Sequence, residues 1–251
     1  MRTLLAVALL ALLASHSLAA APKGDETFFP IMAWNHTPSD PGVLKKMAEC
    51  GLTVCGFAAA KDLDAIHAAG MKAIVHDPRV GGHDWQNVDE KKARENVASL
   101  VKEVNAHPAV FGYYLRDEPP ATYFAGLEKV ASVVRELAPG KWPYINLFPN
   151  YATPGQLASK DYAEYLEKFV ATCKPPILSY DHYALPEGGG LGGNYFRNLE
   201  QMRDAAKKAN LPFWNIVLAT AHFGFREVTH ADFRFQAYTT LAYGGRGISY
   251  F

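Results

Sequence analysis

The segment that decides the fold is a helix–strand–helix pattern across residues 87–140. It reads NVDEKKARENVASLVKEVNAHP (87–108), then VFGYYLRDE (110–118), then TYFAGLEKVASVVRELAPG (122–140). Apolar residues recur at helical spacing in the two outer segments, whereas the central run is apolar along most of its length. A strand that is apolar on both faces is typical of a parallel sheet covered by helices.

The same alternation continues in both directions along the chain. Further strand-like runs cover residues 28–35, 52–58, 71–77, 143–149, 176–183, 212–221 and 245–251, and further helical patterns cover 39–51, 61–70, 153–176, 195–212 and 229–245. Such alternation predicts parallel strands joined by right-handed helical crossovers. Eight strands and seven helices predict a (β/α)8 TIM barrel that lacks its last helix, and we interpret this as a C-terminally truncated chain.

An open doubly wound sheet is the alternative fold. It usually has a glycine-rich phosphate loop after its first strand. This chain has WNHTPSDPG (34–42) there, which favours the barrel.

The first 21 residues have the pattern of a signal peptide. Arg2 precedes an apolar run over residues 4–14, and small residues follow up to Ala21. This run is too short for a membrane span, so we expect cleavage and a secreted or periplasmic protein without a membrane anchor. The predicted single barrel domain therefore covers residues 22–251. The formal net charge is +0 and the basic residues are scattered, which argues against a nucleic-acid partner.

Polar and aromatic residues collect where the predicted strands end. Barrel enzymes carry their sites at this end. The candidate residues are Trp34, His36, His76, Asp77, Tyr114, Asp117, Glu118, Asn146, Asp181, His182 and Tyr183.

The two-residue period of a strand assigns a direction to each side chain. With Glu118 pointing inward, Gly112, Tyr114 and Arg116 point inward too, and Phe111, Tyr113, Leu115 and Asp117 point outward. The outward Asp117 is expected to hold Glu118 or to cap the next helix. On the sixth strand, Ile177, Ser179 and Asp181 point inward. The carboxyl groups of Glu118 and Asp181 should then lie about 5–9 Å apart, as in glycosidases.

This arrangement suits the hydrolysis of a glycosidic bond. Glu118 is the candidate general acid for the leaving oxygen, and Asp181 is the candidate nucleophile or base. Aromatic faces such as Trp34, Tyr114 and Tyr183 suit a carbohydrate. The remaining substrate-binding candidates offer polar groups to sugar hydroxyls: His36, His76, Asp77, Asn146 and His182.

RDEPP (116–120) resembles the Asn-Glu-Pro motif of the large clan of retaining barrel glycosidases. The chain is also similar to secreted bacterial barrel proteins of glycoside hydrolase type, which pair Asp-Glu-Pro with SYDHY (179–183) and end near LAYGGRGISYF (241–251). The resemblance implies that Glu118 is the acid/base and that Asp117 takes the position of the clan's Asn. The clan's nucleophile, a Glu on strand seven, has no counterpart in FWNIVLATAH (213–222). Glu227 in the next loop ranks below Asp181.

Three other functions stay open. SYDHY and RDEP resemble motifs of chitinases and barrel hexosaminidases, in which the acetamido group of the substrate is the nucleophile. A metal-dependent sugar isomerase or epimerase would use His76, Asp77, Glu118, Asp181 and His182, although no HExxH or CxxC spacing occurs. A non-catalytic carbohydrate-binding barrel would explain the absent strand-seven acid. The leading interpretation requires no metal and no cofactor.

Overall fold

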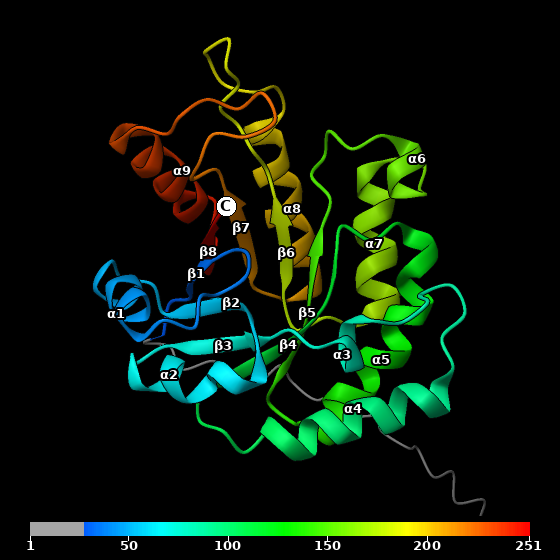
Figure 1. The fold of residues 1–251 in the computed structure, drawn as a ribbon. Coiled ribbons are helices and arrows are strands. Elements are labelled where there is room, and N and C mark those ends of the chain that lie inside the picture. The colour runs from blue at the N-terminus through cyan, green and yellow to red at the C-terminus, as the bar shows by residue number, and fades with distance from the viewer. Residues whose placement is uncertain (1–27) are drawn as a thin grey trace, which may run out of the picture.

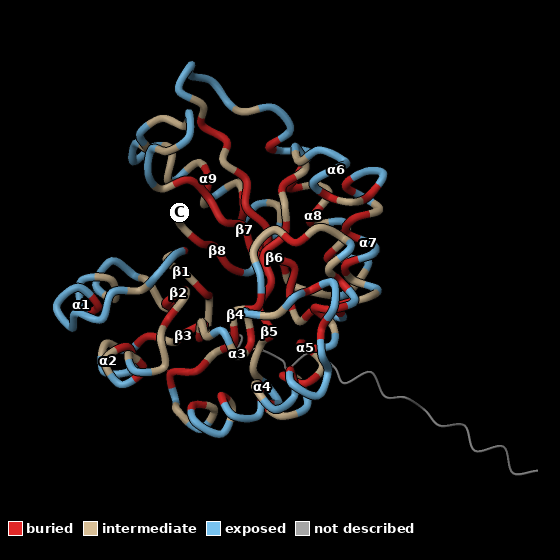
Figure 2. The backbone as a smooth tube through the Cα atoms, turned by 45° about the vertical axis from the view of Figure 1, so that its right-hand side comes forward, coloured by how far each residue is buried: buried red, intermediate tan, exposed pale blue. Residues whose placement is uncertain are grey.

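The computed structural model describes residues 28–251 and is a closed parallel barrel in the order β1 to β8. The strands are β1 (Ile31–Ala33), β2 (Val54–Ala58), β3 (Lys72–Val75), β4 (Val110–Asp117), β5 (Trp142–Leu147), β6 (Leu178–Asp181), β7 (Phe213–Val217) and β8 (Gly247–Tyr250). Strand β8 pairs with β1, which closes the ring. Figure 1 shows the helices outside this ring, and Figure 2 shows continuous buried stretches in the strands and alternating buried and exposed residues along the helices. The predicted TIM barrel is confirmed; the predicted signal peptide lies outside the described residues.

Each of the seven predicted helical segments contains a helix, and the short helix at Pro78–Gly81 was not predicted. The helices are α1 (Pro41–Glu49), α2 (Leu63–Ala68), α3 (Pro78–Gly81), α4 (Glu90–Val104), α5 (Phe124–Leu137), α6 (Pro154–Leu157), α7 (Tyr162–Cys173), α8 (Tyr195–Ala209) and α9 (His230–Ala242), with short 3-10 turns at Ala60–Asp62 and Ala121–Tyr123. Side chains cap the first turns of several helices, for example Asp40 in α1 and Asp89 in α4, whereas α2, α5 and α8 have no side-chain cap. None of the helices in this part of the chain is long and apolar enough to cross a bilayer.

One predicted helix is in fact two. Residues 153–176 form α6 and α7, because Ala158 adopts a left-handed backbone and Asp161 caps a new first turn. Asp161 accepts a hydrogen bond from the backbone N–H of Glu164 at 2.9 Å.

Within residues 28–251 no helix follows β8. A cavity of about 480 Å³ lies there, between α1 and α9 and against the outer faces of β1 and β8.

The barrel interior and the layer under the helices are separate apolar clusters. The interior is built from Met32, Trp34, Val54, Ile74, Tyr144, Ile177, Trp214 and Ile216, with partly buried rings such as Phe111 and Tyr114. Tyr113, Leu115, Leu178 and Tyr180 pack in the outer layer, as the strand period predicts. Phe111 is a correction, because its ring lies inside, 4.7 Å from that of Trp142.

A register shift between Tyr114 and Arg116 explains a second correction. This irregularity in the pairing of β4 with β5 breaks the two-residue period. Arg116 is consequently exposed instead of pointing inward, and its guanidinium lies 6.0 Å from the ring centre of Tyr123.

Candidate active site

Asn146 on β5 is the centre of a polar network at the C-terminal end of the barrel. Its amide nitrogen donates hydrogen bonds to Asp117 at 3.0 Å and to Asp181 at 2.8 Å. Its amide oxygen accepts one from the Ser179 hydroxyl at 2.9 Å, and Ser179 in turn contacts the Tyr144 hydroxyl at 2.6 Å. The network fixes the orientation of the Asn146 amide, so its donor side faces two carboxyl groups.

Asp117 joins this network, which corrects its predicted outward direction. The prediction assumed that neighbouring residues at the end of β4 point to opposite sides. Instead, the backbone of Glu118 has a φ of 41°, in the left-handed region that non-glycine residues rarely adopt. Its backbone N–H still donates to the Asn146 carbonyl at 2.9 Å. The chain therefore turns sharply at Glu118, and both acidic side chains belong to the site.

Strained backbone of this kind often occurs at functional sites. Two further non-glycine residues at this end of the barrel share it, since the φ of Asn35 is 111° and that of Phe57 is 44°. Three of the eight positive-φ non-glycine residues in the described chain therefore lie among the candidate residues.

The carboxyl groups of Glu118 and Asp181 influence each other. The pKa of Glu118 is raised to about 7, mainly by burial and then by the Asp117 charge, while a hydrogen bond with Asp181 opposes the shift. Burial raises the pKa of Asp181 well above its usual value, the charges of Glu118 and Asp117 add to this, and the Asn146 bond opposes it. Asp181 is only 4% exposed. Three carboxyl groups thus share one poorly hydrated region, where holding a proton is favourable near neutral pH.

Four of the predicted substrate-binding residues gather around Phe57 at the ends of β1 to β4. Phe57 contacts the rings of Trp34 (4.7 Å), Tyr114 (4.3 Å), His36 (5.8 Å) and His76 (5.8 Å). Trp34 is 8% exposed, so it belongs largely to the interior. The structure thus brings together an aromatic cluster with two imidazoles beside the carboxyl groups.

Asp77 and His182 are not brought to the carboxyl groups. Asp77 caps α3 by accepting the Arg79 backbone N–H at 2.8 Å, and it also pairs with the Arg79 guanidinium. His182 is buried, and its Nδ1 lies 2.9 Å from Oδ1 of Asn198 on α8. Burial lowers the pKa of His182 to about 4. Both side chains have local structural partners instead.

Tyr183 leads into a second aromatic cluster at the ends of β6 to β8. Its ring stacks on Phe251 at 5.5 Å and contacts His222 at 5.0 Å. Burial raises its pKa, and the charges of Asp181, Asp117 and Glu118 act in the same direction. The acidic residues are therefore flanked by aromatic side chains on both sides.

Tyr151 is a site residue that the sequence interpretation missed. It follows β5 in a loop, and its ring lies 5.0 Å from that of His182. The residue is 48% exposed, and partial burial together with the charges of Asp181 and Glu118 raises its pKa. No periodic pattern marks a loop residue. The one signal available was an aromatic residue four positions after Leu147, at the C-terminal end of a barrel strand.

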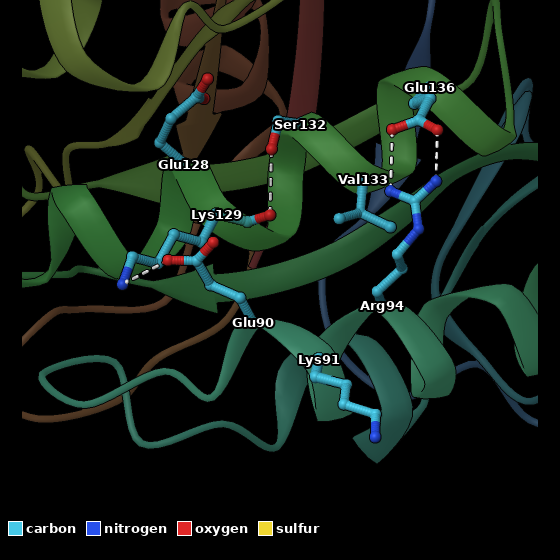
Figure 3. Close-up of a pocket in the computed structure, with 8 residues that line it drawn as sticks. All are labelled: Glu90, Lys91, Arg94, Glu128, Lys129, Ser132, Val133 and Glu136. Atoms are coloured by element: carbon cyan, nitrogen blue, oxygen red, sulfur yellow. Dashed lines mark hydrogen bonds and ion pairs between the residues drawn. The ribbon is translucent and has the colours of Figure 1, made fainter.

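A cavity elsewhere on the surface carries ordinary charge pairs. It has a volume of about 560 Å³ and lies between α4 and α5, with Arg94 paired to Glu136 and Lys129 to Glu90 (Figure 3). These charges are largely exposed and already paired, so the groove offers no concentrated field for a ligand.

No arrangement for a metal ion occurs among residues 28–251, where no three His, Cys, Asp or Glu side chains group as ligands. The ligand set of the isomerase alternative is not assembled, because Asp77 and His182 have the separate partners described above.

Comparison with known proteins finds solved structures that share this fold. No family model matches this chain, and no curated protein sequence does. Its structure resembles a β-galactosidase from the psychrophilic Marinomonas ef1 (TM-score 0.63, 11% identity, 88% of this chain and 54% of that one). It also resembles a glycoside hydrolase family 5 protein from Bacteroides vulgatus ATCC 8482 (TM-score 0.63, 12% identity, 89% of this chain and 57% of that one).

A third similar structure is closer in length. The GH128 (subgroup II) endo-β-1,3-glucanase from Sorangium cellulosum has a TM-score of 0.57 and 16% identity, over 89% of this chain and 87% of that one. The chain spans just over half the length of the β-galactosidase and the family 5 protein. At these identities the likeness shows a shared barrel fold, and the structural neighbours are glycoside hydrolases.

Proposed function

We propose that this protein is a glycoside hydrolase that acts on an oligosaccharide or polysaccharide. The observation that carries the proposal is the cluster of Asp117, Glu118 and Asp181, in which burial raises the pKa of Glu118 to about 7. A carboxyl group with such a pKa is protonated often enough at neutral pH to act as a general acid. The fold shared with glycoside hydrolases supports the same chemistry.

In the proposed reaction Glu118 donates its proton to the glycosidic oxygen as the bond breaks. Asp181 is the second carboxylate and acts on the sugar carbon or on a water molecule, while Asp117 keeps Glu118 protonated through its charge. Asn146 positions both aspartates by its two hydrogen bonds. Tyr183 and the cluster around Phe57 offer apolar faces to the sugar on either side of the acids. Secretion or periplasmic export is part of the proposal, since the signal pattern covers residues 1–21.

The absence of an acid on β7 favours a second mechanism for the same class of reaction. β7 ends at Val217, and Glu227 in the following loop is exposed. A substrate with an N-acetyl group supplies its own nucleophile and needs only the acid and an orienting carboxylate. Asp181, whose charge acts on both Tyr151 and Tyr183, suits that orienting role.

The test is a hydrolysis screen of the purified protein on gluco-, xylo-, manno-, galacto- and N-acetylhexosamine oligosaccharides. We expect release of reducing ends, and a fall of about 10²–10⁴-fold in kcat for Glu118→Gln, the range for a lost general acid. Glu227→Gln is the matched control and should keep activity. Full activity of Glu118→Gln on a substrate that the wild type cleaves would reject the proposal.

The mechanism is read from the products. Cleavage limited to N-acetylhexosaminides favours the substrate-assisted route. NMR of the first-formed anomer then distinguishes retention from inversion.

A further inference from the structure

The tight turn at His222–Phe225 holds an aromatic ring in solvent. Phe223 is 94% exposed, although most large apolar side chains of the described chain are covered. The backbone N–H of Phe225 donates to the His222 carbonyl at 2.8 Å, which closes a four-residue turn. Its central residues, Phe223 and Gly224, have φ values of 43° and 84°.

Phenylalanine is a poor choice for this backbone. Positive φ at both central residues is the pattern of a type I′ turn, which strongly prefers Asn-Gly. A bulky side chain in the left-handed region is strained, and exposure means that Phe223 gains no burial in return. A residue that adopts an unfavourable backbone conformation, and whose side chain gains no stabilising burial, indicates a functional position.

The turn is held firmly by its neighbours. The loops after β6 and β7 pair through the bridge Pro186–Phe225, and the bridge His222–Phe225 closes the turn itself. Two backbone hydrogen bonds join these loops, from Glu187 N–H to the Gly224 carbonyl at 2.9 Å and from Arg226 N–H to the Leu185 carbonyl at 3.0 Å. Figure 1 shows the two loops side by side beyond the strand ends, between β6 and α8 and between β7 and α9.

Phe223 is connected to the carboxyl groups by a series of rings. Its ring lies 5.4 Å from that of His222, which lies 5.0 Å from Tyr183 and 4.6 Å from Phe251. Tyr183 follows Asp181, the last residue of β6, by two positions, and the charges of all three acidic residues raise its pKa. A series of ring contacts therefore leads from the end of β6, beside Asp181, out to Phe223.

We propose that Phe223 is a stacking platform for a sugar ring at an outer subsite, at least one unit away from the bond that Glu118 cleaves. This inference rests on the proposed glycoside hydrolase function and deepens it. A flat ring that already stands in solvent on a fixed turn binds the apolar face of a pyranose without losing much side-chain freedom. The natural substrate is consequently a saccharide chain and not a single glycoside.

The experiment compares chain lengths on Phe223 variants. Phe223→Asn removes the ring and installs the residue that a type I′ turn prefers, so the turn should persist. Phe223→Trp keeps a stacking face and serves as the conservative variant. The probes are disaccharides to hexasaccharides of the series that the wild type cleaves, with kcat/KM measured for each length and melting temperature for each variant.

We expect Phe223→Asn to lower kcat/KM by about tenfold on the hexasaccharide, the size of one aromatic contact, and to leave the disaccharide unchanged. Its melting temperature should equal or exceed that of the wild type, and Phe223→Trp should keep the preference for long chains. An equal loss at all lengths, or no loss at any length, overturns the inference. In either case the loss of activity in Glu118→Gln still supports the hydrolase, so the two proposals fail separately.

One outcome rejects both proposals together. A wild-type protein that neither cleaves nor binds any saccharide series leaves Phe223 as an exposed contact for another molecule, such as a protein partner.

Discussion

The two ends of the barrel interior differ in the side chains that they bury: one end buries aromatic rings and the other buries acidic groups. At the N-terminal ends of the strands, Phe28, Phe111, Trp142 and Trp214 pack ring against ring, with centroid distances such as 4.7 Å between Phe111 and Trp142 and 5.5 Å between Trp142 and Trp214. Gly247 makes room for this packing, since a Cβ there would lie 2.4 Å from the Trp214 ring. This end buries apolar area and therefore stabilises the fold.

The C-terminal end of the same strands collects groups that are costly to bury. Asp117, Glu118 and Asp181 lie close together, no lysine or arginine is hydrogen-bonded to any of them in the described chain, and Asn146 supplies neutral donors instead. Glu118 adds a strained backbone. The comparison teaches that stability is built at one end of the barrel, which allows the other end to hold an arrangement suited to chemistry.

The largest expected effect is a loss of activity on substitution of Asp181, and it would sharpen the contrast between the two ends. Asp181→Asn keeps the shape and the contact with Asn146 but removes the second carboxylate, so kcat should fall by about 10³-fold. The variant should melt no lower than the wild type, because it replaces an ionisable carboxyl group, costly to bury beside two others, by a neutral amide. Kinetics and thermal unfolding, with the exposed Asp84→Asn as control, check both parts. A variant that is active but unstable would break the comparison.

At the N-terminal end, a substitution is expected to lower stability and to leave kcat unchanged. Trp214 is 1% exposed, so Trp214→Ala should lower the free energy of unfolding by about 3–5 kcal/mol. The molecules that remain folded should keep their kcat, since Trp214 lies among apolar rings away from the acids. Urea unfolding measures the loss, and Tyr238→Ala at a 64% exposed position should cost almost nothing. A specific loss of kcat with unchanged stability would contradict this assignment.

The smallest expected effect is a pH dependence at the C-terminal end. The pKa of Glu118 is raised from 4.5 to about 7 in the folded protein, so the folded state holds this proton more tightly than the unfolded chain does. The stabilising contribution of the proton is complete below pH 4.5 and is lost as the pH rises through about 7. Activity should fall over the same upper range, because the general acid loses its proton.

The comparison of wild type with Glu118→Gln checks this linkage. The melting temperature of the variant should gain on that of the wild type as the pH rises from 4.5 to 7. A constant difference across that range would mean that Glu118 does not titrate as the geometry implies.

The strand and helix order was predictable because its signals are local and repeated. The eight apolar runs, and a capping residue such as Asp40, are each recognisable within one segment, whereas the break between α6 and α7 and its cap Asp161 were not predicted. The position of the site followed from the same order, since parallel strands present their C-terminal ends on one side. The direction of Asp117 was not predictable, because the shift in β4 and the left-handed Glu118 interrupt the period on which it depended.

By itself the sequence determined a parallel barrel and the acidic and aromatic residue types at its C-terminal end, because apolar periodicity and helix caps act over a few neighbouring residues. Only the tertiary structure decided which of those side chains meet. It brought Asn146 between two aspartates and added Tyr151, while Asp77 and His182 went to partners in α3 and α8. The physical reason is that proximity across strands depends on register and backbone turns, which residues far apart in the chain set together.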